Sequence, residues 1–517
     1  MASHKHKVLP QIEVSITKKI SVCSKSTHPS NILELSNLDR QFPDLMYAVF
    51  LYKNKSNNPC EISNVEHFAH LQGALEEVLS MWYPAAGRFV VNPSDGKLNI
   101  ICNNAGVVLV DAFTISKISD IFVDPNGAHG LSLHNNGSFE NLVFKPENGS
   151  KQNIEDMPLL VAQVTKFFCG GYSLGIGVSH SLFDAKSGCE FLCAWASQFH
   201  MSRNNVNPLS SLKQIVHERG KFVIANNFPS KMSSIGDQES SGVAAIDHLF
   251  QMIKENGVAD NQGDYKTDEN GSCYVAATFS CTYEMIQRLK NKVAFEGGED
   301  CNLQVYCSSF EVLAAHLWKA KTRVLGQNKE KMVCLQFAVN VRNKMDLSSS
   351  SSSSTLSSQK EGETHFSGNA FVLASVSLTA KEVEEQSYEF IIKKIREAKN
   401  SVTLNYVNAY IHILEHQGSH TSNISSQGRT NSTLLQNLKG LTIVSDWTKL
   451  SYKNINFFGD VAYASPLAPP ISQVVYFLPR NTKESSHNGG GTSIDVKVNL
   501  LPETQDAFAK FFFLGLQ

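Results

Sequence analysis

The chain of 517 residues has no long hydrophobic run and no clear excess of either charge. No stretch approaches the roughly 18 consecutive apolar residues of a membrane-spanning helix, so we expect no membrane span. The formal net charge of −2 gives no electrostatic reason to expect nucleic acid or an anionic membrane as a partner. The mildly basic start, Met1 to Lys7, is not followed by the apolar core of a signal peptide, which favours a cytoplasmic protein.

Cys-x-x-Cys pairs and a serine elbow between a strand and a helix are also missing. The eleven cysteines include no Cys-x-x-Cys pair and no zinc spacing, so the sequence predicts no metal site. Cys169, Cys189 and Cys193 lie in apolar runs, which is typical of buried free thiols in a reducing compartment. No Gly-x-Ser-x-Gly elbow joins a predicted strand to a predicted helix, which disfavours hydrolysis by a serine nucleophile.

The length and composition predict two domains. Hydrophobic residues make up 42% of the chain, which is enough for large cores, and the length exceeds that of one ordinary core. Residues 201–272 are mostly polar apart from a helical pattern at 244–254, as in a long crossover between domains. We place the boundary near Ser234, which gives domains of residues 1–234 and 235–517.

Strand and helix patterns are mixed in both halves, and no internal repeat is visible. In the second half, the sequence predicts a strand at 369–378, one or two helices at 381–415 and a polar loop at 416–432. The serine run within residues 347–359 predicts a disordered surface loop. The expected fold class is therefore α/β, with a cleft between two domains.

One stretch, from Val161 to Asp184, carries the strongest functional signal. Its first arm alternates apolar and polar residues, Gly170-Gly171 permits a tight turn, and residues 172–179 return as a second strand. The pattern predicts a β-hairpin that ends at His180, just before a helix. An imidazole at a strand end is held rigidly, as a general base must be.

Each of the two candidate sites has a plainer interpretation. His180 could be a hydrogen-bonded core histidine, and Asp184 the N-terminal cap of the next helix. Residues 308–320 predict an amphipathic helix with Ser308 or Ser309 near its start, where hydroxyls and N–H groups can receive a phosphate. A core helix with a serine cap fits that pattern equally well.

Six landmarks in the same order resemble those of the plant BAHD acyltransferases, which move an acyl group from coenzyme A to a hydroxyl or amine. They span nearly the whole chain and are Tyr83-Pro-Ala-Ala-Gly-Arg88, Val178-Ser-His-Ser-Leu-Phe-Asp184, Ser309-Phe-Glu-Val-Leu-Ala-Ala-His-Leu-Trp318, Gly368-Asn369, Asp446-Trp447-Thr-Lys-Leu450 and Tyr463-Ala-Ser-Pro466. The resemblance implies two chloramphenicol acetyltransferase-like domains, each a mixed sheet with flanking helices, joined by a long crossover. It also implies a channel through their interface.

The resemblance further implies roles for individual residues. His180 would take the proton from the acceptor as it attacks the thioester, with no acyl-enzyme, and Asp184 would brace the loop through an arginine. Ser445 and Trp447 match positions that face the acceptor, and Ser445 would be an oxyanion donor. The start of the helix at Ser308 and Ser309 would contact coenzyme A. The expected protein is a monomer without a bound cofactor that uses acyl-CoA as co-substrate and a small alcohol or amine as acceptor.

Two positions depart from the family pattern. Ala185 stands where the family usually has glycine, so the loop could need a different backbone conformation. The family's Asp-Phe-Gly-Trp-Gly segment is here Asn456-Phe-Phe-Gly459-Asp460, without the leading carboxylate. In relatives that carboxylate is thought to pair with an arginine, most simply Arg342 here, which Asn456 can hydrogen-bond but cannot neutralise. This change keeps open a second function, an accessory or scaffolding protein with little transferase activity of its own.

Overall fold

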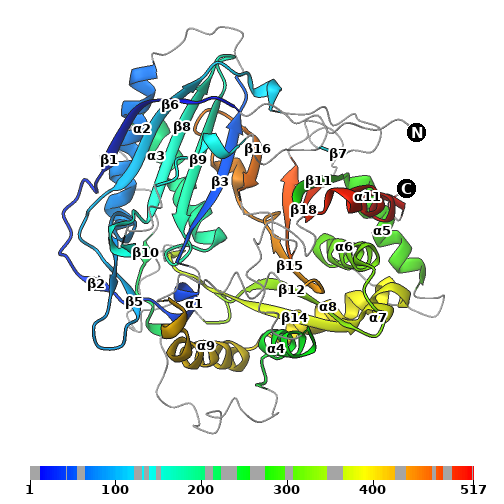
Figure 1. The fold of residues 1–517 in the computed structure, drawn as a ribbon. Helices are drawn as coiled ribbons and strands as arrows, with labels where there is room; N and C mark the ends of the chain where they lie inside the picture. The colour runs from blue at the N-terminus through cyan, green and yellow to red at the C-terminus, as the bar shows by residue number, and fades with distance from the viewer. Residues whose placement is uncertain are drawn as a thin grey trace, which may run out of the picture.

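The computed structural model describes residues 12–41, 43–54, 64–121, 131–132, 139–146, 153–203, 214–222, 241–256, 274–296, 307–345, 365–425, 438–467, 473–480, 492–514 and 516. Two large sheets lie side by side, with helices on their outer faces (Figure 1). The predicted α/β class of mixed sheets with flanking helices is confirmed. Both the predicted boundary near Ser234 and the serine run at 347–359 lie outside the described residues.

The first sheet has six strands in the order β1-β6-β8-β9-β3-β16. Their bounds are β1 (Ser15–Val22), β6 (Val107–Thr114), β8 (Leu160–Phe167), β9 (Tyr172–Ser179), β3 (Leu45–Tyr52) and β16 (Val461–Pro466). The predicted hairpin is confirmed as the antiparallel pair β8–β9, whose turn places Gly170 at a φ of +79°. Helices α2 (Asn64–Met81) and α3 (Ala185–Arg203) cover one face through large apolar side chains such as Phe191 and Trp195.

The second sheet has seven strands in the order β14-β12-β15-β17-β18-β11-β7. Their bounds are β14 (Phe371–Thr379), β12 (Met332–Asn340), β15 (Leu441–Asp446), β17 (Val474–Arg480), β18 (Ser493–Leu500), β11 (Val275–Cys281) and β7 (Leu131–Ser132). One face packs against α5 (Tyr283–Glu296), α6 (Ser309–Leu325), α8 (Tyr388–Ser401) and α11 (Gln505–Leu514), which close the larger core.

Each sheet contains a strand from the other half of the sequence. β16, late in the chain, pairs with β3 in the first sheet, while β7, early in the chain, pairs with β11 in the second. The buried Lys497 on β18 strengthens this exchange, since its Nζ donates to Ser465 Oγ (2.7 Å) and to the Pro466 carbonyl (2.8 Å) on β16. The two halves are therefore interlocked.

Several shorter elements belong to neither of the two large sheets. They are β2 (Ile32–Leu33), β5 (Leu98–Ile101) and β4 (Arg88–Val91), which form a small sheet, the helix α1 (Asn37–Arg40), and the parallel pair β10 (Ile215–Val216) and β13 (His365–Phe366). The pair β10–β13 ties the crossover to the segment that leads into β14.

The helical predictions in the second half were partly correct. The pattern at 244–254 is confirmed as α4 (Ala244–Asn256). Residues 381–415 contain three helices instead of one or two, because α7 (Ala380–Glu385) and α8 precede α9 (Leu404–Ser425). The loop predicted from residue 416 was wrong, since α9 continues to Ser425. The apolar face of α9 packs on the larger core, and once a helix is anchored each further residue adds one hydrogen bond.

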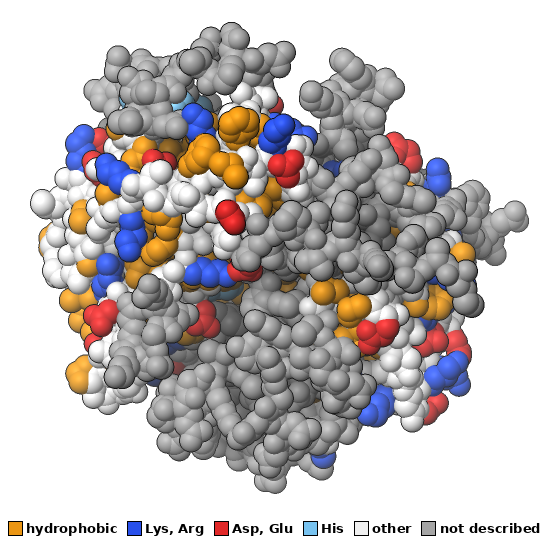
Figure 2. All heavy atoms as spheres, turned by 45° about the horizontal axis from the view of Figure 1, so that its top comes forward, with side chains coloured by type: hydrophobic (Ala, Val, Ile, Leu, Met, Phe, Trp, Pro, Cys, Tyr) orange, Lys and Arg blue, Asp and Glu red, His pale blue; other side chains and the backbone are white. Residues whose placement is uncertain are grey.

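On the face in Figure 2, described acidic and basic side chains are interspersed among hydrophobic ones. Among the described residues, no helix combines the length and apolar character that crossing a bilayer requires.

Candidate active site

His180 lies directly after β9, where the first sheet meets the second. Its N–H donates to the Asp44 carbonyl (3.2 Å), and its own carbonyl accepts from Asn369 Nδ2 (2.6 Å). The ring is partly exposed and lies 5.8 Å from the ring of Phe371, the first residue of β14, measured between centroids. The main chain of His180 is thus fixed from both halves, while part of its side chain reaches solvent.

The surroundings of His180 favour a neutral ring. Burial lowers its pKa, and this outweighs the hydrogen bond to its own carbonyl and the interactions with Asp184, Asn369 and Asp39, which raise it. The pKa therefore lies below the ordinary value for histidine. A neutral imidazole can accept a proton near neutral pH, as a general base must.

Asp184 is buried and faces away from solvent into a set of donors. Arg342 donates to it at two points, from Nη1 to Oδ2 (2.8 Å) and from Nη2 to Oδ1 (2.9 Å). The N–H groups of Ser187 (2.9 Å) and Ala370 (3.1 Å) and the Ser187 hydroxyl (3.0 Å) also donate to it. Burial alone would raise the pKa of Asp184, but Arg342 and these N–H groups hold it below the usual range. The carboxylate therefore caps α3 and binds an arginine, as both interpretations of the sequence expected in part.

The expected contact between Arg342 and Asn456 was wrong. Within the described chain, none of the hydrogen bonds of Arg342 reaches Asn456; they go to Asp184, Asn340, Phe366 and Gly368. Asp184 already neutralises the guanidinium. The altered segment therefore does not leave an uncompensated charge at this point.

Ala185 creates no backbone problem. It is the first residue of α3, is exposed, and is not among the described residues with positive φ. Alanine suits the first turn of a helix, so the departure from glycine has no visible structural cost here.

Ser445 and Trp447 lie at the end of β15 and contact each other. The Trp447 indole N–H donates to Ser445 Oγ (3.1 Å), and the ring packs against the core of the first sheet. β15 runs parallel to β12, and Asn340 at the end of β12 pairs with Phe371. β12 lies between β14, which begins at Phe371, and β15, which ends near Ser445 and Trp447. Phe371 next to His180 is therefore about two strand spacings, of roughly 4.8 Å each, from Ser445 and Trp447.

This edge is open to solvent on the side opposite the larger core. β12 is an interior strand between β14 and β15, yet its residues Ala338 and Asn340 are exposed. The residues that alternate with them, Phe337 and Val339, are buried in the larger core. Helix α4 covers the same face only further back along β12, where Gln336 Nε2 donates to the Ala245 carbonyl (2.8 Å). This interior strand therefore presents exposed side chains next to β14, which begins at Phe371.

The serines at the start of α6 have an evident structural role. Ser308 is the N-cap: its hydroxyl accepts from the Glu311 N–H (3.2 Å), and the Glu311 carboxylate accepts from the Ser308 N–H (2.9 Å). Glu311 also pairs with Arg396 (3.2 Å). The plainer interpretation, a capped core helix, describes this geometry. At the start of the helix, Phe310 packs on Phe337 of β12 (5.3 Å between centroids), on the face of the sheet that forms the larger core.

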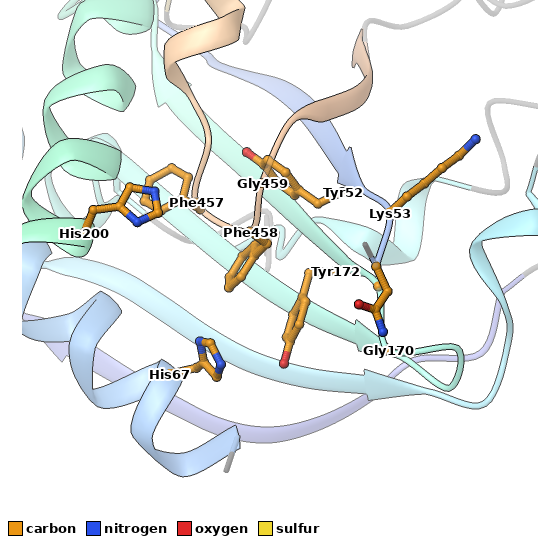
Figure 3. Close-up of a pocket in the computed structure, with 11 residues that line it drawn as sticks. Tyr52, Lys53, His67, Gly170, Tyr172, His200, Phe457, Phe458 and Gly459 are labelled. Carbon is orange, nitrogen blue, oxygen red and sulfur yellow. The ribbon is translucent and has the colours of Figure 1, made fainter. Parts of the chain in front are cut away.

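The segment with Asn456 and Gly459 lies far from His180. Phe457, Phe458 and Gly459 line a cavity of about 200 Å³ beside Tyr172 and two histidines (Figure 3). Tyr172 begins β9 and His180 follows its end, so the strand separates them by roughly 26 Å at about 3.3 Å per residue. Phe457 packs on Trp195 (4.9 Å between centroids), which gives this segment a role in the core of the first sheet.

Sequence reasoning missed a second buried ion pair near His180. Arg219 Nε donates to Asp39 Oδ2 (3.2 Å), and neither side chain is exposed. Asp39 Oδ1 in turn accepts from the main-chain N–H of Asn369 (3.0 Å) and from its side-chain Nδ2 (2.9 Å). Asp39 and Ser36 form a capping box at the start of α1, which by itself accounts for an aspartate at this position. The sequence therefore gave no reason to pair Asp39 with Arg219.

Solved structures with a similar fold cover nearly the whole chain. The overall fold is similar to that of vinorine synthase, with a TM-score of 0.61 over 96% of both chains at 15% identity. It is also similar to TRI101 of F. sporotrichioides, solved in complex with coenzyme A and T-2, with a TM-score of 0.59 over 92% of this chain and 96% of that one at 15% identity.

Comparison of the sequence with known proteins assigns the chain to one family. Residues 12–512 match the family described as the Transferase family. The chain is 38% identical to Brassinosteroid-related acyltransferase 1 of Arabidopsis thaliana, covering 98% of this chain and 99% of the relative. It is 27% identical to Omega-hydroxypalmitate O-feruloyl transferase of the same plant, covering 97% and 93%. The chain belongs to the Transferase family, that of the plant BAHD acyltransferases.

Proposed function

We propose that this protein moves an acyl group from an acyl-CoA thioester to a hydroxyl or amine of a small acceptor, with His180 as the general base. The observation that carries the proposal is the position of His180. Its ring is partly exposed at a sheet edge where Ala338 and Asn340 open to solvent, and its pKa is held below the ordinary value. Family membership supports the acyl transfer itself.

In the proposed reaction the imidazole takes the proton from the acceptor as its oxygen or nitrogen attacks the thioester carbonyl. The tetrahedral intermediate carries an oxyanion, and Ser445 is the proposed donor to it. Since Ser445 Oγ accepts from Trp447, its own O–H remains to donate. Collapse of the intermediate breaks the carbon–sulfur bond, and the protonated His180 returns the proton to the departing thiolate.

Asp184 has a supporting role in this proposal, because its carboxylate is already occupied by Arg342 and two N–H groups. The start of α6 is the proposed coenzyme A contact, as the family resemblance implies. With Ser308 engaged as the cap, Ser309 is the hydroxyl we propose for that contact. The cytoplasmic location and the monomeric state remain predictions from the sequence.

The alternative function, an accessory protein without transferase activity, rested on the loss of a carboxylate at Asn456. That argument is weaker now, because Asp184 neutralises Arg342 and Asn456 lies near the opposite end of β9. The two functions still make opposite predictions about activity.

The test uses purified protein with acetyl-, malonyl- and hydroxycinnamoyl-coenzyme A and a panel of alcohols and amines. We expect release of free thiol that depends on the acceptor, and its loss in His180→Ala. The exposed His28, replaced in His28→Ala, serves as a matched control with activity unchanged. If the unmodified protein releases no thiol across the panel and a partner protein co-purifies with it, the accessory function is favoured.

A further inference from the structure

We propose that Asn369 is a positioning residue for His180, which it holds by the main-chain carbonyl, and that Asp39 fixes Asn369 in turn. The inference rests on the proposed role of His180 as general base. It assigns to two fully buried polar residues a part in acyl transfer beyond their contribution to packing.

The geometry of the Asn369 amide is specific. Its Nδ2 donates to the His180 carbonyl (2.6 Å) and to Asp39 Oδ1 (2.9 Å), and its main-chain N–H donates to the same oxygen (3.0 Å). One amide nitrogen thus serves two acceptors, which uses both of its hydrogens. Aspartate at this position would place an oxygen against two acceptors, and alanine would leave both without this donor.

Asp39 is itself held in place. Besides Arg219 Nε (3.2 Å), its Oδ2 accepts from the N–H of Ser36 (3.0 Å) and from the hydroxyl of Ser36 (2.6 Å). A buried carboxylate with an arginine and several hydrogen bonds is rigid, because breaking any one of them leaves a charge poorly solvated.

Asn369 belongs to a segment, residues 367–370, that contacts both buried ion pairs. The contacts are Arg219 Nη1 to Ser367 Oγ (3.0 Å), Arg342 Nη2 to the Gly368 carbonyl (2.9 Å), Asn369 to Asp39, and the Ala370 N–H to Asp184 Oδ2 (3.1 Å). Every residue of this segment therefore meets a charged side chain. The His180 carbonyl is attached to a fixed frame built from both halves.

Fixing this carbonyl also fixes the proton on the imidazole. The main-chain carbonyl of His180 raises the pKa of its own ring. Because a carbonyl only accepts, we infer that the ring nitrogen nearer to it carries the proton, and that the other nitrogen of the neutral ring keeps the lone pair that acyl transfer needs. The charged groups that act on the ring are Asp184 and Asp39, each paired with an arginine. Asn369 selects the tautomer by holding the carbonyl in place.

The first test compares Asn369→Ala and Asn369→Ser with the unmodified enzyme. We expect kcat to fall roughly 100-fold, the loss typical of a misplacement of about 1 Å, with KM changed little. The acid limb of kcat/KM should move to lower pH, because the variants lose an interaction that favours the protonated ring. Serine is smaller than asparagine and cannot reach both acceptors, so it gives a second variant should alanine fail to fold.

The second measurement needs no turnover. In ¹⁵N-labelled protein, the imidazole nitrogens of His180, assigned by their absence in His180→Gln, should report a single neutral tautomer, and Asn369→Ser should report a mixture. The matched control is Asn37→Ala, which removes another buried asparagine between the halves, bonded to Glu415 (2.7 Å), without touching His180. It should lower stability and leave kcat and the tautomer unchanged.

Two outcomes separate the failure of this inference from the failure of the proposed function. Full activity in His180→Ala removes the general base, and with it the basis of both. If His180→Ala is inactive but the Asn369 variants keep the kcat and the tautomer of the unmodified protein, only the positioning role is overturned. A mixed tautomer in the unmodified protein also overturns it.

Discussion

Arg342 and Asp184 form a two-point ion pair, with distances of 2.8 and 2.9 Å, that joins the end of β12 in the second sheet to the start of α3 beside the first. Both side chains are nearly inaccessible to solvent, at 10% and 6% exposure. His180 lies four residues before Asp184. The pair therefore fixes the spacing of the two halves where the proposed reaction takes place.

Removing one charge of this pair should be costly. Asp184→Asn leaves the Arg342 guanidinium buried without its counter-charge, so we expect a loss of about 3–5 kcal/mol in the free energy of unfolding. Urea unfolding followed by fluorescence measures it. Replacing both residues, as Asp184→Leu with Arg342→Met, should cost less than Asp184→Asn alone. A single variant as stable as the unmodified protein would show that the pair does not hold the halves together.

The pH dependence of catalysis should reflect the lowered pKa of His180. Since the base works in its neutral form, kcat/KM is lost as pH falls through that pKa. Burial places the pKa below the ordinary 6.5, so the midpoint of the acid limb should lie below 6.5. Initial rates of thiol release between pH 4.5 and 8 at a fixed ionic strength, on the order of 0.1 M, measure it. A midpoint above 6.5 would contradict the balance of burial and charge described for this ring.

Restoring the family carboxylate should bring no benefit. Asn456 is partly exposed, and the contacts that fix its loop run through its main-chain carbonyl, which accepts from His200 Nε2 (2.9 Å). Asn456→Asp should therefore change the free energy of unfolding by less than about 0.5 kcal/mol and leave kcat unchanged. A gain in both thermal stability and activity would mean that this segment interacts with Arg342 after all.

Gly368 should not tolerate a side chain. A Cβ there would lie 2.6 Å from Arg219 Cζ and 2.9 Å from Phe366 Cζ, both in well-packed surroundings. We expect Gly368→Ala to lower the free energy of unfolding by about 1–3 kcal/mol through overpacking. Gly73→Ala is the control, because no atom lies within 4 Å of the added carbon, and alanine in α2 should be neutral or stabilising. Equal behaviour of the two variants would argue against a fixed position for Arg219.

Local features of the site could be predicted from sequence. The alternation before Gly170-Gly171 gave the hairpin, and the apolar spacing after Asp184 gave α3, because both patterns arise from neighbours in the chain. The cap at Ser308 was anticipated for the same reason.

Contacts between distant segments could not be predicted in this way. Asn369 bonds residues 189 and 330 positions away, and the pairing of Asp39 with Arg219 spans 180 positions. Periodicity carries no information on such pairs. The same holds for the exchange of β7 and β16 between sheets, which depends on tertiary packing.

A crystal structure of the protein with coenzyme A bound tests the central claim most directly. We predict that the pantetheine arm enters between the two sheets at the open edge near Ala338, with its sulfur within hydrogen-bonding reach of His180. Coenzyme A bound elsewhere, with the imidazole enclosed by packed side chains, would contradict the assignment of His180 as the base for acyl transfer.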